Sequence, residues 1–205
     1  EWLDFRKGRI GASDIPKILN VSPWGSAYDL WLEKKGKKSE QAETSAMRKG
    51  KELEPAFRKM AEEYYDEIFE PAVFVHDDYN WAMASLDGIS LDGHIIELKN
   101  PREKAFLDFV ESKQIPLDYQ YQCQWQMFVT DAQYVSFGMQ FEGAKEMKVV
   151  LRNEVMIQEA FKAAQDFMHC LENDIEPAKK ESDRIFIDDV QFLRLEKIFA
   201  GLKEE

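Results

Sequence analysis

The hydrophobic pattern has a helical period in the first third of the chain and the period of strands after it. Apolar residues recur three and four positions apart, which predicts a turn followed by a helix in residues 8–20 and helices in residues 26–35 and 43–65. Stretches rich in β-branched and aromatic residues then predict five strands, at 68–75, 81–90, 94–100, 133–141 and 147–152. Further amphipathic helices are expected at 102–113, 117–130 and 154–173. This order predicts an α/β fold, with a central mixed β-sheet flanked by helices.

Capping residues and proline refine the helix boundaries. Ser13 or Asp14 can cap the first helix, with Pro16 in its first turn. Pro55 lies inside the third helix, so we expect either a kink or a helix start near Glu52. We divide the chain into one domain at residues 1–177 and a charged C-terminal extension, predicted to be helical, at residues 178–205.

The composition is that of one folded domain. Of the 205 residues, 44% are hydrophobic and 13% aromatic, which is enough for a core. No apolar run approaches the ~20 residues that cross a bilayer, and the first residues lack the basic and apolar regions of a signal peptide. Two cysteines, Cys123 and Cys170, cannot form a disulfide framework or a four-cysteine metal site. We therefore expect a reducing, cytoplasmic setting, with Cys123 as a small apolar core residue.

The net charge of −12 argues, as a total, against a nucleic-acid partner. Its distribution is uneven: residues 1–51 hold 11 Lys/Arg against 7 Asp/Glu, whereas residues 52–205 hold 16 against 32. The first part could face a polyanion, and some of the later acidic residues could hold metal ions. Charge alone favours the simpler interpretation, which is a solvated acidic surface.

Three charged residues on two neighbouring strands are the strongest candidates for chemistry. Glu97 and Lys99 are two apart on one strand, so their side chains share a face while the residues beside them point into the core. Asp87 precedes Glu97 by ten residues, on the preceding strand. If a three-residue loop spans 92–94, Asp87 lies opposite Lys99 and on its face. A two-residue turn would place Asp87 on the wrong face, so this interpretation requires the longer loop or a bulge at Gly88.

Two carboxylates and a lysine that converge in this way would hold a hard divalent cation beside a positive group. Carboxylate oxygens suit Mg²⁺ or Mn²⁺. Such an ion lowers the pKa of a bound water and neutralises charge on a phosphate, and Lys99 could position or deprotonate that water. A surface pair on an edge strand explains Glu97 and Lys99 equally well. On the residues alone, both interpretations stay open.

Five ordered motifs add a family resemblance to this pattern. They are Arg6-Lys7-Gly8-Arg9-Ile10-Gly11-Ala12-Ser13-Asp14, Met47-Arg48-Lys49-Gly50-Lys51-Glu52-Leu53-Glu54-Pro55, Ser85-Leu86-Asp87-Gly88, Glu97-Leu98-Lys99-Asn100-Pro101 and Tyr119-Gln120-Tyr121-Gln122-Cys123-Gln124. With them, residues 2–177 resemble the YqaJ-like viral recombinase and phage lambda exonuclease family. This family belongs to the restriction-endonuclease-like superfamily of Asp…Glu-x-Lys nucleases, so the resemblance implies a restriction-endonuclease-like core. Leu86 stands where the family usually has proline, and Asn100 stands where threonine is common.

The resemblance implies a metal site and a catalytic lysine. Asp87 and Glu97 match the metal-binding carboxylates of the family, and Lys99 matches its catalytic lysine. Glu54 matches a helix carboxylate that completes the site, and the backbone carbonyl of Leu98 would also face a metal. The implied cofactor is Mg²⁺, two ions per active site, for which Mn²⁺ can substitute.

The resemblance also implies a pocket for the 5′-phosphate of a DNA end. Its residues would be Arg6, Ser13, Ser85 and Gln122, and Met47 matches an apolar wedge that separates the terminal base pair. Arg6 offers a planar fork to a phosphate, and Ser13 opens a predicted helix. Simpler roles stay open: Ser13 as a helix cap, Gln122 as a buried structural amide, and Met47 as a core residue, which is the more frequent role of methionine.

The implied activity is that of a Mg²⁺-dependent 5′→3′ double-strand DNA exonuclease of phage-type recombination, which resects DNA ends to leave 3′ single strands. The implied partners are double-stranded DNA ends, a single-strand annealing recombinase protein and further copies of the chain in a trimeric ring, with no membrane. The implied setting is the cytoplasm of a bacterial host, for a phage or prophage protein. Two alternatives are an endonuclease on the same fold and a catalytically weak module that binds DNA ends.

Overall fold

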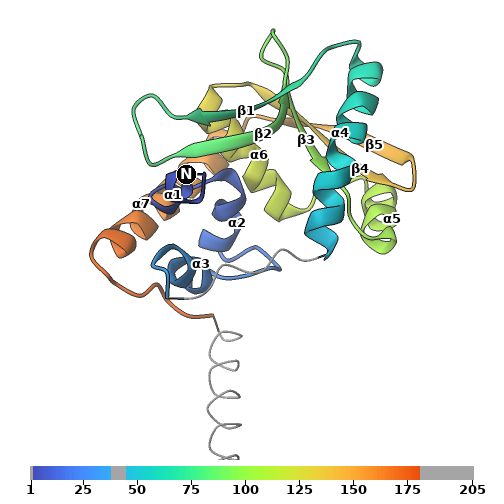
Figure 1. The fold of residues 1–205 in the computed structure, drawn as a ribbon. Helices are drawn as coiled ribbons and strands as arrows, with labels where there is room; N and C mark the ends of the chain where they lie inside the picture. The colour runs from blue at the N-terminus through green and yellow to red at the C-terminus, as the bar shows by residue number, and fades with distance from the viewer. Residues whose placement is uncertain (1, 38–44, 181–205) are drawn as a thin grey trace, which may run out of the picture.

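A five-stranded sheet forms the centre of the molecule (Figure 1). The structure is a computed structural model that describes residues 2–37 and 45–180, with the main chain only at residues 2–4 and 45–47. The predicted C-terminal helix therefore lies, from residue 181 onward, outside the described residues. The strands are adjacent in chain order: β1 (Glu70–Val75), β2 (Met83–Ile89), β3 (Ile95–Lys99), β4 (Tyr134–Phe141) and β5 (Ala144–Leu151).

The sheet is mixed because one of its four pairings is parallel. β3 runs parallel to β4, and the other neighbours are antiparallel. A parallel pair needs a long crossover, and the helices α5 (Glu103–Ser112) and α6 (Leu117–Thr130) provide it. The predicted α/β fold with a mixed sheet flanked by helices is therefore confirmed. The bounds of α6 agree with the prediction, and the strand bounds differ from it by no more than a few residues.

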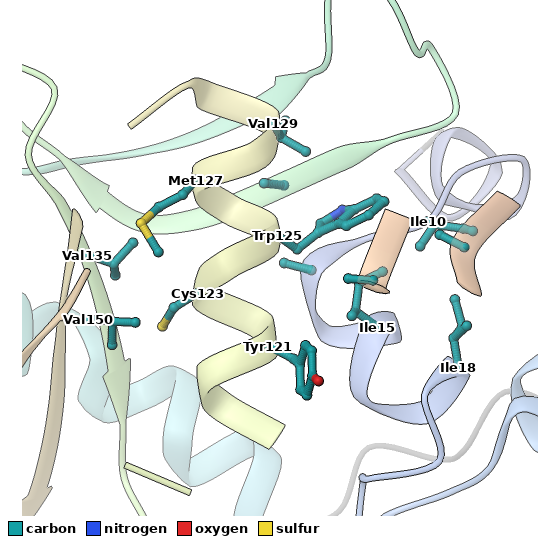
Figure 2. Packing of buried hydrophobic residues seen from close by; sticks show 14 of the residues in the cluster. Ile10, Ile15, Ile18, Tyr121, Cys123, Trp125, Met127, Val129, Val135 and Val150 are labelled. Atoms are coloured by element: carbon teal, nitrogen blue, oxygen red, sulfur yellow. The ribbon is translucent and has the colours of Figure 1, made fainter. Parts of the chain in front are cut away.

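Helices cover both faces of the sheet. On one face α6 packs on β2, with α7 (Glu154–Glu172), the 3₁₀ helix η1 (Ala12–Asp14), α2 (Ile15–Ile18) and α3 (Ala27–Lys34) around it. On α6, Trp125 points toward the N-terminal segment and Cys123 toward the sheet, so the helix joins the two (Figure 2). The other face is covered by α4 (Ser45–Tyr65), where Phe57 and Ala61 form a smaller cluster with β3. No helix of the described residues is both long and apolar enough to cross a membrane.

The N-terminal segment has one helix more than predicted. This short helix, α1 (Trp2–Lys7), comes first, and the predicted turn and helix of residues 8–20 follow it, with the helical part beginning at η1. The carboxylate of Asp14 accepts the N–H of Gly11 at 3.0 Å and pairs with the Nζ of Lys34 at 3.0 Å. Ser13 is exposed. Asp14 therefore contacts the N-cap residue Gly11 from the third position of η1, and the prediction that the side chain of Ser13 or Asp14 itself caps the helix is wrong.

The long helix α4 begins before Pro55 rather than near it. It runs from Ser45 to Tyr65 with Pro55 inside, so the predicted start near Glu52 is wrong. Its N-terminal half extends past the end of β3, where the side-chain amide of Asn100 lies 3.5 Å from the carbonyl of Gly50. This placement brings Glu54 toward the end of the sheet.

The hairpin between β2 and β3 places the candidate active-site residues. Its loop has the three residues that the sequence required, but at 91–93 rather than 92–94. The paired residues end at Gly88 and Ile96, and continuing this register sets Asp87 opposite Glu97 rather than opposite Lys99 as predicted. Because the partner moves by two residues, from Lys99 to Glu97, strand alternation still assigns Asp87 to the face that these two residues share.

Gly88 lies at an irregularity of β2. The register between β1 and β2 shifts beside it, between Glu70 and Ala72 of β1. This shift belongs to the β1–β2 pairing, whereas the bulge at Gly88 was an alternative to the longer loop between β2 and β3, and it is the longer loop that the structure has. A Cβ on Gly88 would lie 2.8 Å from the Cβ of Phe69 and 2.8 Å from the Cγ1 of Ile96, so the close approach of these two side chains requires glycine at the residue after Asp87.

A buried polar network joins the segment that follows α4 to β4, away from the candidate site. His94 is 5% exposed, and its Nδ1 lies 3.0 Å from Glu67 and its Nε2 2.8 Å from Ser136. Partial burial raises the pKa of Glu67, but the hydrogen bonds from His94 and Ser90 outweigh this and lower it below its ordinary value. The network therefore depends on an ionised Glu67.

Candidate active site

Glu97 is a buried carboxylate at the centre of the candidate site. It is 1% exposed, on β3, on the side of the sheet that faces α6. Its Oε1 accepts a hydrogen bond of 2.7 Å from the amide of Gln122, and its Oε2 accepts one of 2.5 Å from the amide of Gln126. Lys99 forms an ion pair with the same carboxylate. The expectation that Glu97 and Lys99 share a face therefore agrees with this contact.

Lys99 ends β3 and is the more accessible member of the pair. Its side chain is 25% exposed, and its Nζ lies 5.3 Å from the ring centre of Tyr119. Desolvation lowers the pKa of Lys99, but the charges of Glu97 and Asp87 outweigh it and raise the pKa above its ordinary value. In this arrangement Lys99 carries a positive charge next to two carboxylates.

Asp87 enters the site from β2 and lies against the main chain of β3. Its Oδ2 accepts the N–H of Leu98 at 2.7 Å. Burial and then the negative charge of Glu97 raise the pKa of Asp87 to about 7, while Lys99 and the Leu98 N–H act in the opposite direction. The charge of Glu54 raises it further. Three carboxylates thus lie within one another's electric field, although they come from three different elements.

Glu54 reaches this group through an arginine that sequence reasoning missed. The Nη2 of Arg58 lies 2.5 Å from Glu54 Oε1, and its Nε donates to the main-chain oxygen of Asp87 at 2.6 Å. A signal for Arg58 was present, because it follows Glu54 by four residues on a predicted helix, the spacing of a helical ion pair. Gln126 was missed in the same way, four residues after Gln122.

The side chains of this centre are of the kind that binds a hard divalent cation. Three carboxylates offer oxygen ligands, and burial, followed by the negative charge of Glu97, raises the pKa of Asp87. Within the described residues, no three His, Cys, Asp or Glu side chains converge closely enough to hold a metal ion. Both oxygens of Glu97 are instead bound to neighbouring groups, two glutamines and Lys99, whereas the contact of Glu54 with Arg58 is made by Oε1. The residues therefore fit a divalent cation by chemistry and charge, with rearrangement of the side chains around Glu97.

The residues predicted to bind a 5′-phosphate are only partly brought together. Gln122 is bonded to Glu97, as expected of a buried structural amide, and so belongs to the carboxylate centre. Arg6 lies in the last turn of α1, half-buried, with its Nη2 3.8 Å from where a Cβ on Gly11 would lie. Ser13 and Ser85 are exposed. Among the side chains that the structure describes, no hydrogen bond links these four residues to one another. The side chain of Met47 lies outside the described residues.

A buried lysine fixes the main chain that carries Arg6 and Ser13. Lys34, on α3, donates to the carbonyls of Arg9 at 2.6 Å and Arg6 at 3.3 Å, besides its ion pair with Asp14. Asn100, which departs from the family pattern, accepts from Gln140 at 2.6 Å. Lys34 was not singled out from the sequence, and Asn100 was noted there only as a departure from the family pattern.

Comparison with known proteins identifies the family. The sequence matches the YqaJ-like viral recombinase domain over residues 1–133, more than half of the chain. The chain belongs to this family. Another YqaJ-like sequence, the uncharacterized protein YqaJ of Bacillus subtilis (strain 168), is 28% identical over 174 residues, which is 82% of this chain and 54% of that protein. The chain thus spans about half the length of the curated relative it matches.

Solved structures share the fold of this YqaJ-like domain. The alkaline exonuclease LHK-Exo from Laribacter hongkongensis is 24% identical, with a TM-score of 0.73 over 85% of this chain and 93% of that one. Its complex with dAMP gives a TM-score of 0.76 at 23% identity with the same coverage. A phage-related exonuclease from Haemophilus somnus 129PT gives 0.59 at 13% identity, over 82% and 96% of the two chains. At these identities the likeness establishes the fold.

Proposed function

We propose that this YqaJ-like domain is a Mg²⁺-dependent 5′→3′ exonuclease that digests one strand of double-stranded DNA from its end. The observation that carries the proposal is the buried carboxylate of Glu97, paired with Lys99 and in the electric field of Asp87. Lys99 balances one buried negative charge, and Asp87 adds a second carboxylate beside it, which is more than an ion pair that serves only the fold needs. Asp87, Glu97 and Lys99 are the proposed catalytic residues.

In this proposal Asp87, Glu97 and Glu54, with the carbonyl of Leu98, would hold two Mg²⁺ ions, with Mn²⁺ as a substitute. When bound, the ions would activate a water and neutralise charge on the phosphate. Gln122 and Gln126 hold both oxygens of Glu97 and so fix its direction. Lys99, 25% exposed beside Glu97, would orient the attacking water or the scissile phosphate.

The end of the DNA would be anchored by the 5′-phosphate group. Arg6 and Ser13 lie on the segment that Lys34 and Asp14 hold in place, and Ser85 lies on β2 two residues before Asp87. Arg6 would bind the phosphate with its planar guanidinium, while the two exposed hydroxyls would donate hydrogen bonds. Gln122 would contribute an amide and Met47 an apolar wedge at the terminal base pair.

The relatives support a place for this activity in phage-type recombination. The related fold includes an alkaline exonuclease that was solved with dAMP, which agrees with a DNA substrate. We therefore infer that the product, a 3′ single strand, passes to a single-strand annealing recombinase protein. A trimeric ring around the DNA would place acidic surfaces outside, in the cytoplasm of a bacterial host that carries the phage or prophage.

A comparison of linear and closed circular DNA as substrates tests this proposal. We expect Mg²⁺-dependent digestion of a linear duplex, survival of a closed circle, and faster loss of whichever strand bears the 5′-phosphate. Arg6→Ala should remove the preference for the phosphate, whereas Lys7→Ala, an exposed neighbour on the same helix, should keep it.

Other outcomes select the alternatives. If the closed circle is cut as fast as the linear duplex, the protein is an endonuclease on the same fold. If DNA ends are bound with no release of nucleotides in Mg²⁺ or Mn²⁺, it is an end-binding module. Digestion that starts from 3′ ends would overturn the proposed polarity and the phosphate pocket together.

A further inference from the structure

Arg58 joins two of the carboxylate-bearing elements with one edge of its guanidinium group. Its Nε donates to the main-chain oxygen of Asp87 at 2.6 Å, and its Nη2 lies 2.5 Å from the carboxylate of Glu54. The Nε and Nη2 of arginine lie on the same edge of the planar group, so both contacts can be made at once. Arg58 is 15% exposed at its side chain and Glu54 is 32% exposed, so water competes little for the arginine.

We propose that Arg58 is a positioning residue, which fixes the carboxylate of Glu54 relative to Asp87 for binding of a divalent cation. This inference rests on the proposed function. Glu54 has three rotatable side-chain bonds and approaches the strands from α4, whereas Asp87 is set by β2. A carboxylate that is held in place before binding loses less conformational entropy when it binds.

The place of the contact on β2 supports this role. The carbonyl that Arg58 binds belongs to Asp87 itself, beside the shift in register between β1 and β2. A strand at such an irregularity loses regular ladder hydrogen bonds, so a donor from another element is needed there. Arg58 therefore fixes the main chain of one carboxylate residue and the side chain of another.

If Arg58 acted only through its charge, its removal would have the opposite effect on metal binding. A positive charge beside a cation site repels the cation, so its removal would tighten metal binding. If Arg58 instead holds Glu54 in place, its removal weakens metal binding even though a repulsive charge is lost. Arg58→Lys separates the two effects further, because lysine keeps the charge but has a single nitrogen and cannot bind both oxygens along one edge.

The experiment measures Mn²⁺ binding to the whole chain without DNA, from the signal of free Mn²⁺ in electron paramagnetic resonance. Removal of groups that orient metal ligands typically weakens metal affinity about 10–100-fold, so we expect Arg58→Met to raise the Kd at least about 10-fold. Arg58→Lys should raise it several-fold. Lys59→Met removes the same charge from the next, exposed residue of α4 and should stay within about two-fold of wild type.

A second readout separates positioning from a loss of folding. In nuclease assays the Arg58→Met variant should need more Mn²⁺ for half-maximal rate and should recover most of the wild-type rate at saturating Mn²⁺. An unchanged or lower Kd in Arg58→Met, at an unfolding midpoint equal to wild type, would overturn the proposal. If Arg58→Met does not fold, Arg58→Lys decides, since wild-type affinity in that variant overturns the proposal as well.

The same data distinguish this inference from the proposed function. A wild-type protein that neither binds Mn²⁺ nor cleaves DNA overturns both. A wild-type protein that does both, with wild-type affinity in the Arg58 variants, overturns the role of Arg58 alone.

Discussion

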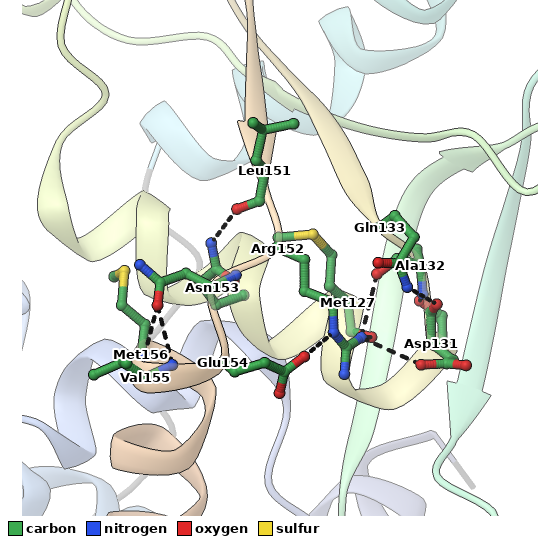
Figure 3. A network of polar contacts seen from close by, with 12 residues as sticks. Met127, Asp131, Ala132, Gln133, Leu151, Arg152, Asn153, Glu154, Val155 and Met156 are labelled. Carbon is green, nitrogen blue, oxygen red and sulfur yellow. Dashed lines mark hydrogen bonds and ion pairs between the residues drawn. The ribbon is translucent and has the colours of Figure 1, made fainter.

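Arg152 closes the C-terminal end of α6, the helix that carries the glutamines bound to Glu97 (Figure 3). Its Nη1 donates to the main-chain oxygens of Met127 at 2.7 Å and Ala132 at 3.2 Å. Met127 is among the last four residues of α6, whose carbonyls have no partner within the helix. We predict that Arg152→Met destabilises the fold, mainly because these two oxygens lose their donor.

The exposure of the partners of Arg152 allows the loss of stability in Arg152→Met to be estimated. Arg152 also forms ion pairs with Glu154 and, at 3.5 Å, with Asp131, but these partners are 61% and 92% exposed. Exposed ion pairs contribute about 0–1 kcal/mol, whereas a hydrogen bond from a charged donor contributes about 1.5–3 kcal/mol. Because both carbonyl bonds share one nitrogen, we count one full bond and a weaker second one. The expected loss is about 2–3 kcal/mol.

Urea unfolding followed by circular dichroism measures this loss. At roughly 2–4 °C per kcal/mol for a chain of this size, the melting temperature should fall by about 5–10 °C. Arg152→Lys keeps the charge and a donor, so it should lose about half as much free energy. Glu154→Gln removes only the exposed ion pair and should cost about 0.5 kcal/mol or less. If Glu154→Gln is as destabilising as Arg152→Met, the surface pair and not the carbonyl cap is the source of stability, and the reasoning is refuted.

Three further predictions concern the sheet and the core. Gly88→Ala should lower the free energy of unfolding in urea by about 1–3 kcal/mol, because its Cβ would meet the Cβ of Phe69; a variant as stable as wild type would contradict the close approach. Glu67→Gln should be less stable than wild type at pH 7, and the difference should vanish as the pH falls through the lowered Glu67 pKa, below the ordinary value of about 4.3. A difference that persists unchanged to pH 3, measured by unfolding, would show that ionisation of Glu67 is not involved. Burial raises the pKa of the Cys123 thiol, so mass spectrometry after native alkylation should find Cys170 modified before Cys123, with the reverse order contradicting the packing of α6.

The fold was predictable where local periodicity decides it. The observed bounds of the helix at 117–130 are the predicted ones; it begins directly after Pro116 and ends before Asp131, which has a left-handed backbone conformation. The common face of Glu97 and Lys99 follows from strand alternation alone, since side chains two apart point the same way. A loop of three residues was expected because a two-residue turn would have placed Asp87 and Glu97 on opposite faces of the sheet.

The remaining features depend on contacts between distant parts of the chain. The hairpin register differed from the prediction by one residue on each strand, because turn residues alone leave the choice between 91–93 and 92–94 open. Arg58 and Gln126 stand out only once the sheet places Asp87 and Glu97 beside their helices. Lys34 is charged and would be expected in solvent. It is instead buried, and its Nζ contacts the carbonyl oxygens of Arg6 and Arg9 and the carboxylate of Asp14.

The central claim is that Glu97 and Lys99 form part of a metal-dependent nuclease centre. The most direct measurement is the initial rate of nucleotide release from a 5′-phosphorylated linear duplex with Mg²⁺, for wild type, Lys99→Ala and Lys104→Ala, a lysine on α5 that is 86% exposed. We expect that EDTA abolishes the release of nucleotides. The initial rate should be about 10²–10⁴-fold lower in Lys99→Ala and equal to that of wild type in Lys104→Ala. Release that persists in EDTA, or a wild-type rate in a folded Lys99→Ala variant, would contradict the central claim.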